Sequence, residues 1–221
     1  MKASKSLIAL GLLFALPAAA QERNERLNYR IHHQLWGDIG TISEEIRSDG
    51  ATTRVATNLD IHVALFGITL HDARGTWNEV WEDGSLREFR ATTIVDGTTE
   101  TTEGRNEGKV FAIRAGEKRS EAPADVQPVN PWSLQFVRAK TLMSPESGRL
   151  MPAVSRDEGM ATVPVQGSAA RLHHYTVDAG GTHHLYFDDE GTMVQFEVAD
   201  ITGKATITLD RPRAMRIAAV K

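Results

Sequence analysis

Short stretches in which apolar and polar residues alternate, each ended by a glycine-containing turn, recur along most of this chain. A period of two is typical of a strand with one buried face, because successive side chains of a strand point to opposite sides of the sheet. One long stretch runs from Thr53 to Val63 and is rich in β-branched residues. The others cover 27–35, 77–95, 109–116 and 192–210. The pattern predicts a mostly β protein, an antiparallel meander that forms a half-open roll or barrel.

One segment interrupts the alternation. Prolines between residues 123 and 131 precede a run in which Trp132, Phe136 and Val137 share a helical spacing. Asn130 is placed to cap such a helix, and Pro131 suits its first position. We therefore expect one short helix near residues 131–140.

The first twenty residues have the features of a secretory signal peptide. Lys2 and Lys5 precede an apolar run from Leu7 to Leu16, and Ala18-Ala19-Ala20 forms an A-x-A cleavage site. The run is too short to cross a bilayer core of about 30 Å, so an uncleaved anchor is the weaker alternative. We expect cleavage before Gln21, a periplasmic location, and a single β-rich domain over residues 21–221 without a transmembrane anchor.

Composition excludes several classes of function. The formal net charge of −4 becomes more negative when the two lysines of the signal peptide are removed, so nucleic acid is not an expected partner. The chain has no cysteine, which excludes disulfides, thiol catalysis and cysteine-ligated zinc. It also lacks an H-E-x-x-H motif, a nucleophile elbow and a glycine-rich phosphate loop. No recognisable catalytic motif or cofactor signature remains, and we expect no cofactor.

The hairpin around Asp83-Gly84 contains a candidate carboxylate dyad. A two-residue turn there places Trp81 opposite Leu86, Glu79 opposite Glu88, and Trp77 opposite Arg90, all on one face. Like charges so placed repel, and burial raises the pKa of a carboxyl group, so Glu79 and Glu88 are candidates for general acid and base. Two alternatives stay open: a solvated face on which Arg90 neutralises Glu79, or a bulge that separates the pair.

A second hairpin, RLHHYTVDAGGTHHLYFDDEG, carries four of the eight histidines. Pairing of His174 with Leu185 makes His174 and His183 diagonal neighbours on one face and leaves His173 and His184 on the other. This split excludes one four-histidine site, because zinc ligands must converge on a single point. His174 and His183 remain metal candidates only if a carboxylate joins them, and ordinary strand positions are the alternative that we favour.

The aromatic residues Trp77, Trp81, Trp132 and Phe136 are either part of the core or the lining of an apolar cavity. A side of the sheet that carries two tryptophans is expected to face inward, because soluble proteins rarely expose such a patch without a use. Together with Arg90, which suits a polar head group, these side chains are the candidate ligand-binding set.

Several motifs resemble a family of exported bacterial proteins that is known as a domain of unknown function. They are E-x-W-x-D-G-x-L at 79–86, Pro-Trp at 131–132, Ser-Gly-Arg-Leu at 147–150, and Leu-Tyr-Phe-Asp-Asp-Glu-Gly at 185–191. Tyr186 departs from the pattern, which usually has tryptophan at this position. The resemblance implies a spiral β-roll, the architecture attributed to a neighbouring family and to proteins assigned as glycolipid binders.

These observations together favour a non-catalytic periplasmic protein that binds an amphipathic or apolar, lipid-like ligand. One alternative is a hydrolase that uses Glu79 and Glu88 or a histidine-bound metal. Another is a structural protein of the cell envelope that binds a protein partner along an exposed strand edge.

Overall fold

The structure is a computed structural model that describes residues 23–200 and 202–210; the predicted signal peptide, residues 1–20, lies outside the described residues. Nearly all regular structure in this part of the chain is β. The strands are β1 (Arg23–His33), β2 (Gly37–Asp49), β3 (Thr52–Leu65), β4 (Ile68–Glu82), β5 (Ser85–Val95), β6 (Thr98–Asn106), β7 (Val110–Ala115), β8 (Lys118–Pro123), β9 (Gln127–Pro128), β10 (Thr141–Met143), β11 (Leu150–Pro152), β12 (Val154–Val165), β13 (Ser168–Asp178), β14 (Thr182–Phe187), β15 (Met193–Asp200) and β16 (Gly203–Leu209).

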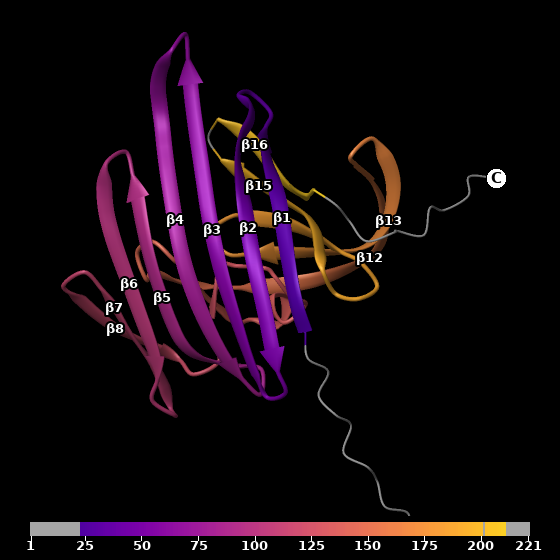
Figure 1. The fold of residues 1–221 in the computed structure, drawn as a ribbon. Helices are drawn as coiled ribbons and strands as arrows, with labels where there is room; N and C mark the ends of the chain where they lie inside the picture. Colours follow the sequence, from indigo (N-terminus) through magenta and orange to yellow (C-terminus); the bar gives the residue numbers. More distant parts are fainter. Residues whose placement is uncertain (1–22, 201, 211–221) are drawn as a thin grey trace, which may run out of the picture.

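Thirteen of these strands form one antiparallel sheet in the order β12-β13-β14-β15-β16-β1-β2-β3-β4-β5-β6-β7-β8. Two meanders, β1–β8 and β12–β16, are joined side by side where β16 pairs with β1. The sheet curves on itself, and the strands of the second meander cross behind the long strands β1–β4 in Figure 1. It does not close, because β8 and β12 remain its two edges. The predicted half-open antiparallel roll is confirmed.

Two-residue turns join several of the long hairpins. Four of them pair a residue of positive φ with a glycine of positive φ: Phe66-Gly67, Asp83-Gly84, Asp96-Gly97 and Gln166-Gly167. This backbone matches the right-handed twist of the flanking strands, and glycine at its second position avoids a steric penalty. The predicted turn at Asp83-Gly84 is confirmed, with Trp81 opposite Leu86.

The concave face of the sheet carries the core. The largest fully buried side chains include Tyr29, Phe89, Phe111 and Phe187, and they belong to one hydrophobic cluster drawn from both meanders. Tyr29 on β1 also donates its hydroxyl to the backbone carbonyl of Met193 on β15, at 3.2 Å. The two halves of the sheet are therefore held together by shared packing as well as by the β1–β16 ladder.

The segment between β8 and β12 packs apolar side chains against this concave face. Val126, Phe136, Leu142 and Met143 are buried in the same cluster. The strands β9, β10 and β11 in this segment form a separate small sheet. The expected helix near residues 131–140 is only a 3-10 turn, Phe136–Arg138, and no helix of the described residues is long and apolar enough to cross a membrane.

Candidate functional site

Glu79 and Glu88 lie on opposite faces of the β4–β5 hairpin, so the predicted carboxylate dyad is wrong. One extra residue on β5, Arg87, shifts the register, with the result that Glu79 opposes Phe89 and Val80 opposes Glu88. Glu79 points into the core, whereas Glu88 is exposed. The bulge that the sequence left open as an alternative is the arrangement that forms.

The sequence contained a signal for this bulge. The buried residues Leu86 and Phe89 are three positions apart, whereas a regular strand repeats every two positions. Two buried residues that are three positions apart can lie on one face only if the strand contains one additional residue between them, and Arg87 is that residue.

Glu79 is the centre of a buried polar cluster in the core. Its Oε1 accepts a hydrogen bond from Asn130 Nδ2 at 2.8 Å, and its Oε2 accepts bonds from Trp81 Nε1 at 2.8 Å and Trp132 Nε1 at 3.1 Å. Burial raises the pKa of Glu79 to about 7, against the opposing effect of these three donors. Asn130, which the sequence placed as a helix cap, instead fastens the segment before β10 to this carboxyl and to Thr57 Oγ1 at 3.1 Å.

A second carboxyl, that of Glu44 on β2, belongs to the same cluster. Burial, and next the nearby charge of Glu79, raise the pKa of Glu44 to about 8. Its Oε2 is buried and has no hydrogen-bond partner in the structure. The sequence reasoning missed this pairing, although Glu44 stands between Ile42 and Ile46 at a position where the alternation calls for an apolar residue.

Carboxyl groups with raised pKa are often acid or base catalysts, so Glu44 and Glu79 have either a catalytic or a structural role. Glu44 and Glu79 are only 2% and 1% exposed, and a substrate cannot reach them in this conformation. The hydrogen bonds of Glu79, together with that of Asn130 to Thr57, instead link β3 and β4 to the segment that contains Asn130 and Trp132. The cluster is a structural anchor.

The structure divides the candidate ligand-binding set. Trp77, Trp81, Trp132 and Phe136 are all buried in the core, and the rings of Trp81 and Trp132 meet edge to face at 5.9 Å. Arg90 lies on the opposite face, since Trp77 opposes Ala91 and not Arg90. The predicted placement of an arginine beside these tryptophans is therefore wrong. Trp132 also borders an open groove of about 430 Å³.

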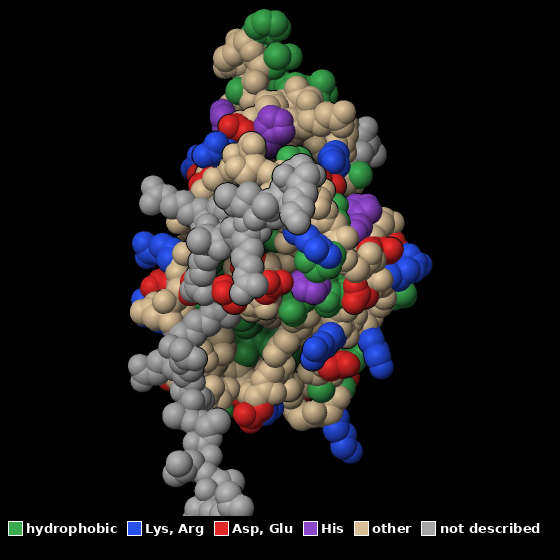
Figure 2. Space-filling view, turned by 90° about the vertical axis from the view of Figure 1, so that its right-hand side faces the viewer, with side chains coloured by type: hydrophobic (Ala, Val, Ile, Leu, Met, Phe, Trp, Pro, Cys, Tyr) green, Lys and Arg blue, Asp and Glu red, His purple; other side chains and the backbone are tan. Residues whose placement is uncertain are grey.

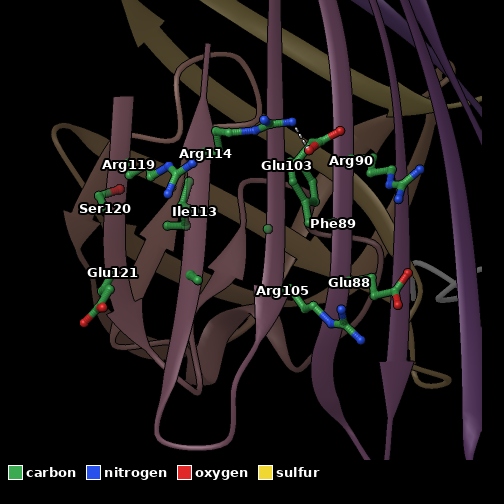
Figure 3. Close-up of a pocket in the computed structure, with 12 residues that line it drawn as sticks. Glu88, Phe89, Arg90, Glu103, Arg105, Ile113, Arg114, Arg119, Ser120 and Glu121 are labelled. Carbon is green, nitrogen blue, oxygen red and sulfur yellow. Dashed lines mark hydrogen bonds and ion pairs between the residues drawn. The ribbon is translucent and has the colours of Figure 1, made fainter. Parts of the chain in front are cut away.

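A larger hollow lies on the outer face of β5–β8 and has a volume of about 560 Å³ (Figure 3). Two rows of residues that oppose one another across these four strands line it. The rows are Glu88, Arg105, Ala112 and Glu121, and Arg90, Glu103, Arg114 and Arg119. Glu88 and Arg90, which the sequence singled out for other reasons, thus lie in the same hollow.

Positive charge predominates in the second row. Arg114 donates from Nη2 to Glu103 Oε2 at 2.7 Å, an ion pair marked in Figure 3. Within the described ranges, Arg90 and Arg119 of this row form no ion pair, nor does Arg105 of the first row. The side chains of all three are exposed. The hollow therefore offers guanidinium groups whose hydrogen-bonding capacity is not taken up by carboxylates of this chain.

The histidine hairpin has a different register from the predicted one. A three-residue loop follows Asp178, and Thr182 donates its hydroxyl to Asp178 Oδ1 at 2.6 Å. His174 consequently opposes Tyr186, and its Nε2 lies 3.0 Å from Nδ1 of His184.

His174 and His183 are on opposite faces, so their predicted placement as diagonal neighbours is wrong. Burial, and next the neighbouring His184, lower the pKa of His174. Throughout residues 23–200 and 202–210, no three histidine, aspartate or glutamate side chains are grouped so that they could hold a metal ion.

Comparisons with known proteins identify a family and a similar fold, both described as domains of unknown function. The sequence profile of a family described as a domain of unknown function (DUF6134) matches residues 36–210. The structure is similar to the crystal structure of a β-barrel-like protein of domain of unknown function DUF1849 from Brucella abortus, with a TM-score of 0.63 and 11% identity, over 85% of this chain and 96% of that chain. No curated protein matches the sequence. The expected membership of an uncharacterised family with a roll-like β architecture is confirmed.

Proposed function

The chain belongs to the DUF6134 family, a domain of unknown function, and on this premise we propose that it is a non-catalytic periplasmic protein that binds an anionic amphiphile. By this we mean a molecule with an apolar body and a carboxylate or phosphate head group. The observation that carries the proposal is the hollow on the outer face of β5–β8, with its unpaired arginines. Its volume of about 560 Å³ falls in the range of roughly 300–1,000 Å³ that is usual for small-molecule sites.

The arginines suit an anionic head group. Arg90, Arg114 and Arg119 belong to one row across the sheet, in which neighbouring strands are about 4.8 Å apart, so one ligand can contact more than one of them. The guanidinium group is planar and donates two parallel hydrogen bonds to a carboxylate or phosphate. Arg114 is partly neutralised by Glu103, which leaves Arg90 and Arg119, three strands or about 14 Å apart, as the contacts at the two ends of the row.

The floor of the hollow suits an apolar body. Ala112 on β7 has the smallest side chain of the two rows, so its position leaves part of the hollow unfilled. The methylene stems of the surrounding arginines add apolar surface, as such stems commonly do. An amphiphile can therefore lie along the strands with its head group at the row of Arg90 and Arg119.

Catalysis has less support than binding. The hydrolase alternative depended on Glu79 facing Glu88, or on histidines that converge on a metal, and neither arrangement forms. Export rests on the lysines, apolar run and cleavage site of residues 1–20, and it is part of the proposal.

Isothermal titration of the mature chain with dodecyl phosphate and with dodecanoate, both below their micelle concentrations, tests the site. We expect saturable binding that weakens by about tenfold or more in the Arg90→Gln/Arg119→Gln variant, because hydrogen bonds to charged groups are each worth roughly 1.5–3 kcal/mol. Arg171→Gln removes an exposed arginine from β13 and is the matched control, which should bind as the wild type does. Equal affinity in all three proteins, or tighter binding of uncharged dodecanol, would contradict the proposal.

Native mass spectrometry of protein purified from its own cells gives an independent test. A co-purified anionic lipid or fatty acid that disappears in the Arg90→Gln/Arg119→Gln variant supports the proposal. A stoichiometric metal, or a bound second protein in place of a small molecule, argues for a different function.

A further inference from the structure

The β3–β4 hairpin extends beyond the rest of the sheet. β2 pairs with β3 only as far as Ile61, and β5 pairs with β4 only from Ala73 onward. Residues 63–71 therefore pair only with each other in the sheet, and Figure 1 shows this hairpin reaching past all the others. Hairpins that stand alone in water are marginal in stability, so a projecting one of this length calls for an explanation.

The end of this hairpin, residues 63–70, is here called the hairpin tip. Its sequence, VALFGITL, contains no charged residue. Phe66 is 95% exposed, Ile68 66%, Leu70 48% and Leu65 44%. Figure 2 shows apolar side chains capping this end of the molecule, above histidine and acidic side chains. Contiguous exposed apolar surface of this kind usually marks a site of contact with a membrane or a protein.

Apolar side chains surround the hairpin tip and do not form a single face. Leu65 and Ile68 oppose each other next to the turn, and Phe66 occupies the turn itself with a positive φ. Leu70 is the extra residue of a bulge between the pairs formed by Val63 and Ala64. A protein groove contacts one face of a hairpin, whereas a lipid phase contacts all of them, so this distribution fits a lipid phase better.

We propose that the hairpin tip inserts into the surface of a lipid bilayer and holds the protein there reversibly. This inference does not depend on the proposed ligand site over β5–β8. Insertion is shallow, because the two edges of the hairpin carry backbone groups that need water or a headgroup as a partner.

A protein partner fits the hairpin tip less well. A specific protein interface involves roughly 20–30 residues on each side, whereas the hairpin tip has eight residues and is two strands wide. The same comparison disfavours a second copy of this chain. Leu35, in the β1–β2 turn at the same end of the sheet in Figure 1, is 62% exposed and can add a second, lesser contact with a bilayer.

The surroundings of the hairpin tip indicate which lipids suffice. Behind it, Nδ1 of His62 lies 3.3 Å from Asp72 Oδ2, and Nδ1 of His71 lies 3.1 Å from Asp96 Oδ2. These pairs do not form a basic patch of the kind that attracts anionic lipids. Binding is therefore driven by burial of apolar side chains, and zwitterionic lipid is enough.

Vesicle flotation of the mature protein tests the proposal, with vesicles of phosphatidylcholine alone and of phosphatidylethanolamine and phosphatidylglycerol at 3:1. We expect the wild type to float with both, with little loss at 0.5 M salt. Phe66→Ser/Ile68→Ser should lower the partition coefficient by about tenfold or more, given the apolar area removed. Val154→Ser/Met160→Ser removes two exposed apolar side chains from β12 and is the matched control, which should float normally.

A second readout keeps the test independent of folding defects. In Phe66→Trp, the fluorescence of the new indole should shift to the blue on addition of vesicles and be quenched by brominated acyl chains. The proposal would be overturned if the wild type floated with neither kind of vesicle, or if Phe66→Ser/Ile68→Ser floated as well as the wild type. Sedimentation that showed self-association through the hairpin tip, without vesicle binding, would also overturn it, because the tip would then contact a second copy of this chain and not a bilayer.

Discussion

Replacing Glu44 by glutamine turns a buried carboxyl of β2 into an amide that cannot ionise while preserving its shape. In the folded protein, burial and the charge of Glu79 raise the pKa of Glu44 from 4.5 to about 8. In the unfolded chain the same group is solvated and titrates near its ordinary value. Between these two values the folded protein keeps a proton that the unfolded chain has released, so the free energy of unfolding falls as pH rises.

The size of this effect follows from the shift. Each pKa unit corresponds to about 1.4 kcal/mol, so between pH 5 and pH 8 the group lowers the stability of the wild type by on the order of 4 kcal/mol. The Glu44→Gln variant does not lose this stability. We therefore expect its stability relative to the wild type to rise by on the order of 4 kcal/mol over the same interval. Glu79, with a pKa raised to about 7, gives both proteins a further loss of stability of the same sign over a narrower interval, up to about pH 7.

Urea denaturation followed by tryptophan fluorescence at pH 5, 6, 7 and 8 measures this difference. The matched control is Glu45→Gln, the next residue on the same strand but on the outer face, where Arg47 lowers the pKa of the carboxyl. Glu45 is ionised in both states above pH 5, so its replacement should not change the slope. A difference between Glu44→Gln and the wild type that stays constant from pH 5 to pH 8 would refute the reasoning.

Three further predictions concern the core and the N-terminus. Gly104→Ala should lower the free energy of unfolding by about 1–3 kcal/mol in urea titrations, because the new Cβ would lie 2.1 Å from the ring of Phe111; no loss would show that the ring moves freely. Asn130→Ala should cost about 2–3 kcal/mol in the same assay and raise the pKa of Glu79, which loses a donor, so stability should continue to fall to a higher pH than in the wild type. N-terminal sequencing of protein from a periplasmic fraction should begin at Gln21, and recovery of Met1 would contradict cleavage of the signal peptide.

The candidate sites depended on register, which the alternation determined only in part. The pattern assigned Glu79 to the same face as Trp77 and Trp81, and the structure places it there. The predicted partner of Glu79 across the hairpin, Glu88, was wrong. The bulged residue Arg87 exchanges the faces of all the residues that follow it on β5. A strand repeats every two residues, so one inserted residue turns an inward neighbour into an outward one.

The histidine hairpin shows the same dependence on a single residue. Loops of two or four residues leave His174 and His183 on one face, whereas the three-residue loop, closed by Asp178 and Thr182, separates them. Instead His184 becomes the neighbour of His174. Local sequence does not select among these loop lengths, because the choice also depends on how β14 pairs with β15 behind it.

By itself, the sequence determined the features that depend on local physics: the antiparallel meander, the two-residue turn at Asp83-Gly84, and the inward-facing aromatic residues. Tertiary structure alone decided which distant residues meet. The cluster of Glu44 and Glu79 with Asn130 joins segments that are far apart in the chain, and the arginines of the row come from three different strands. Alternation specifies which face a side chain occupies, but contacts across several strands depend on the pairing of every strand between them.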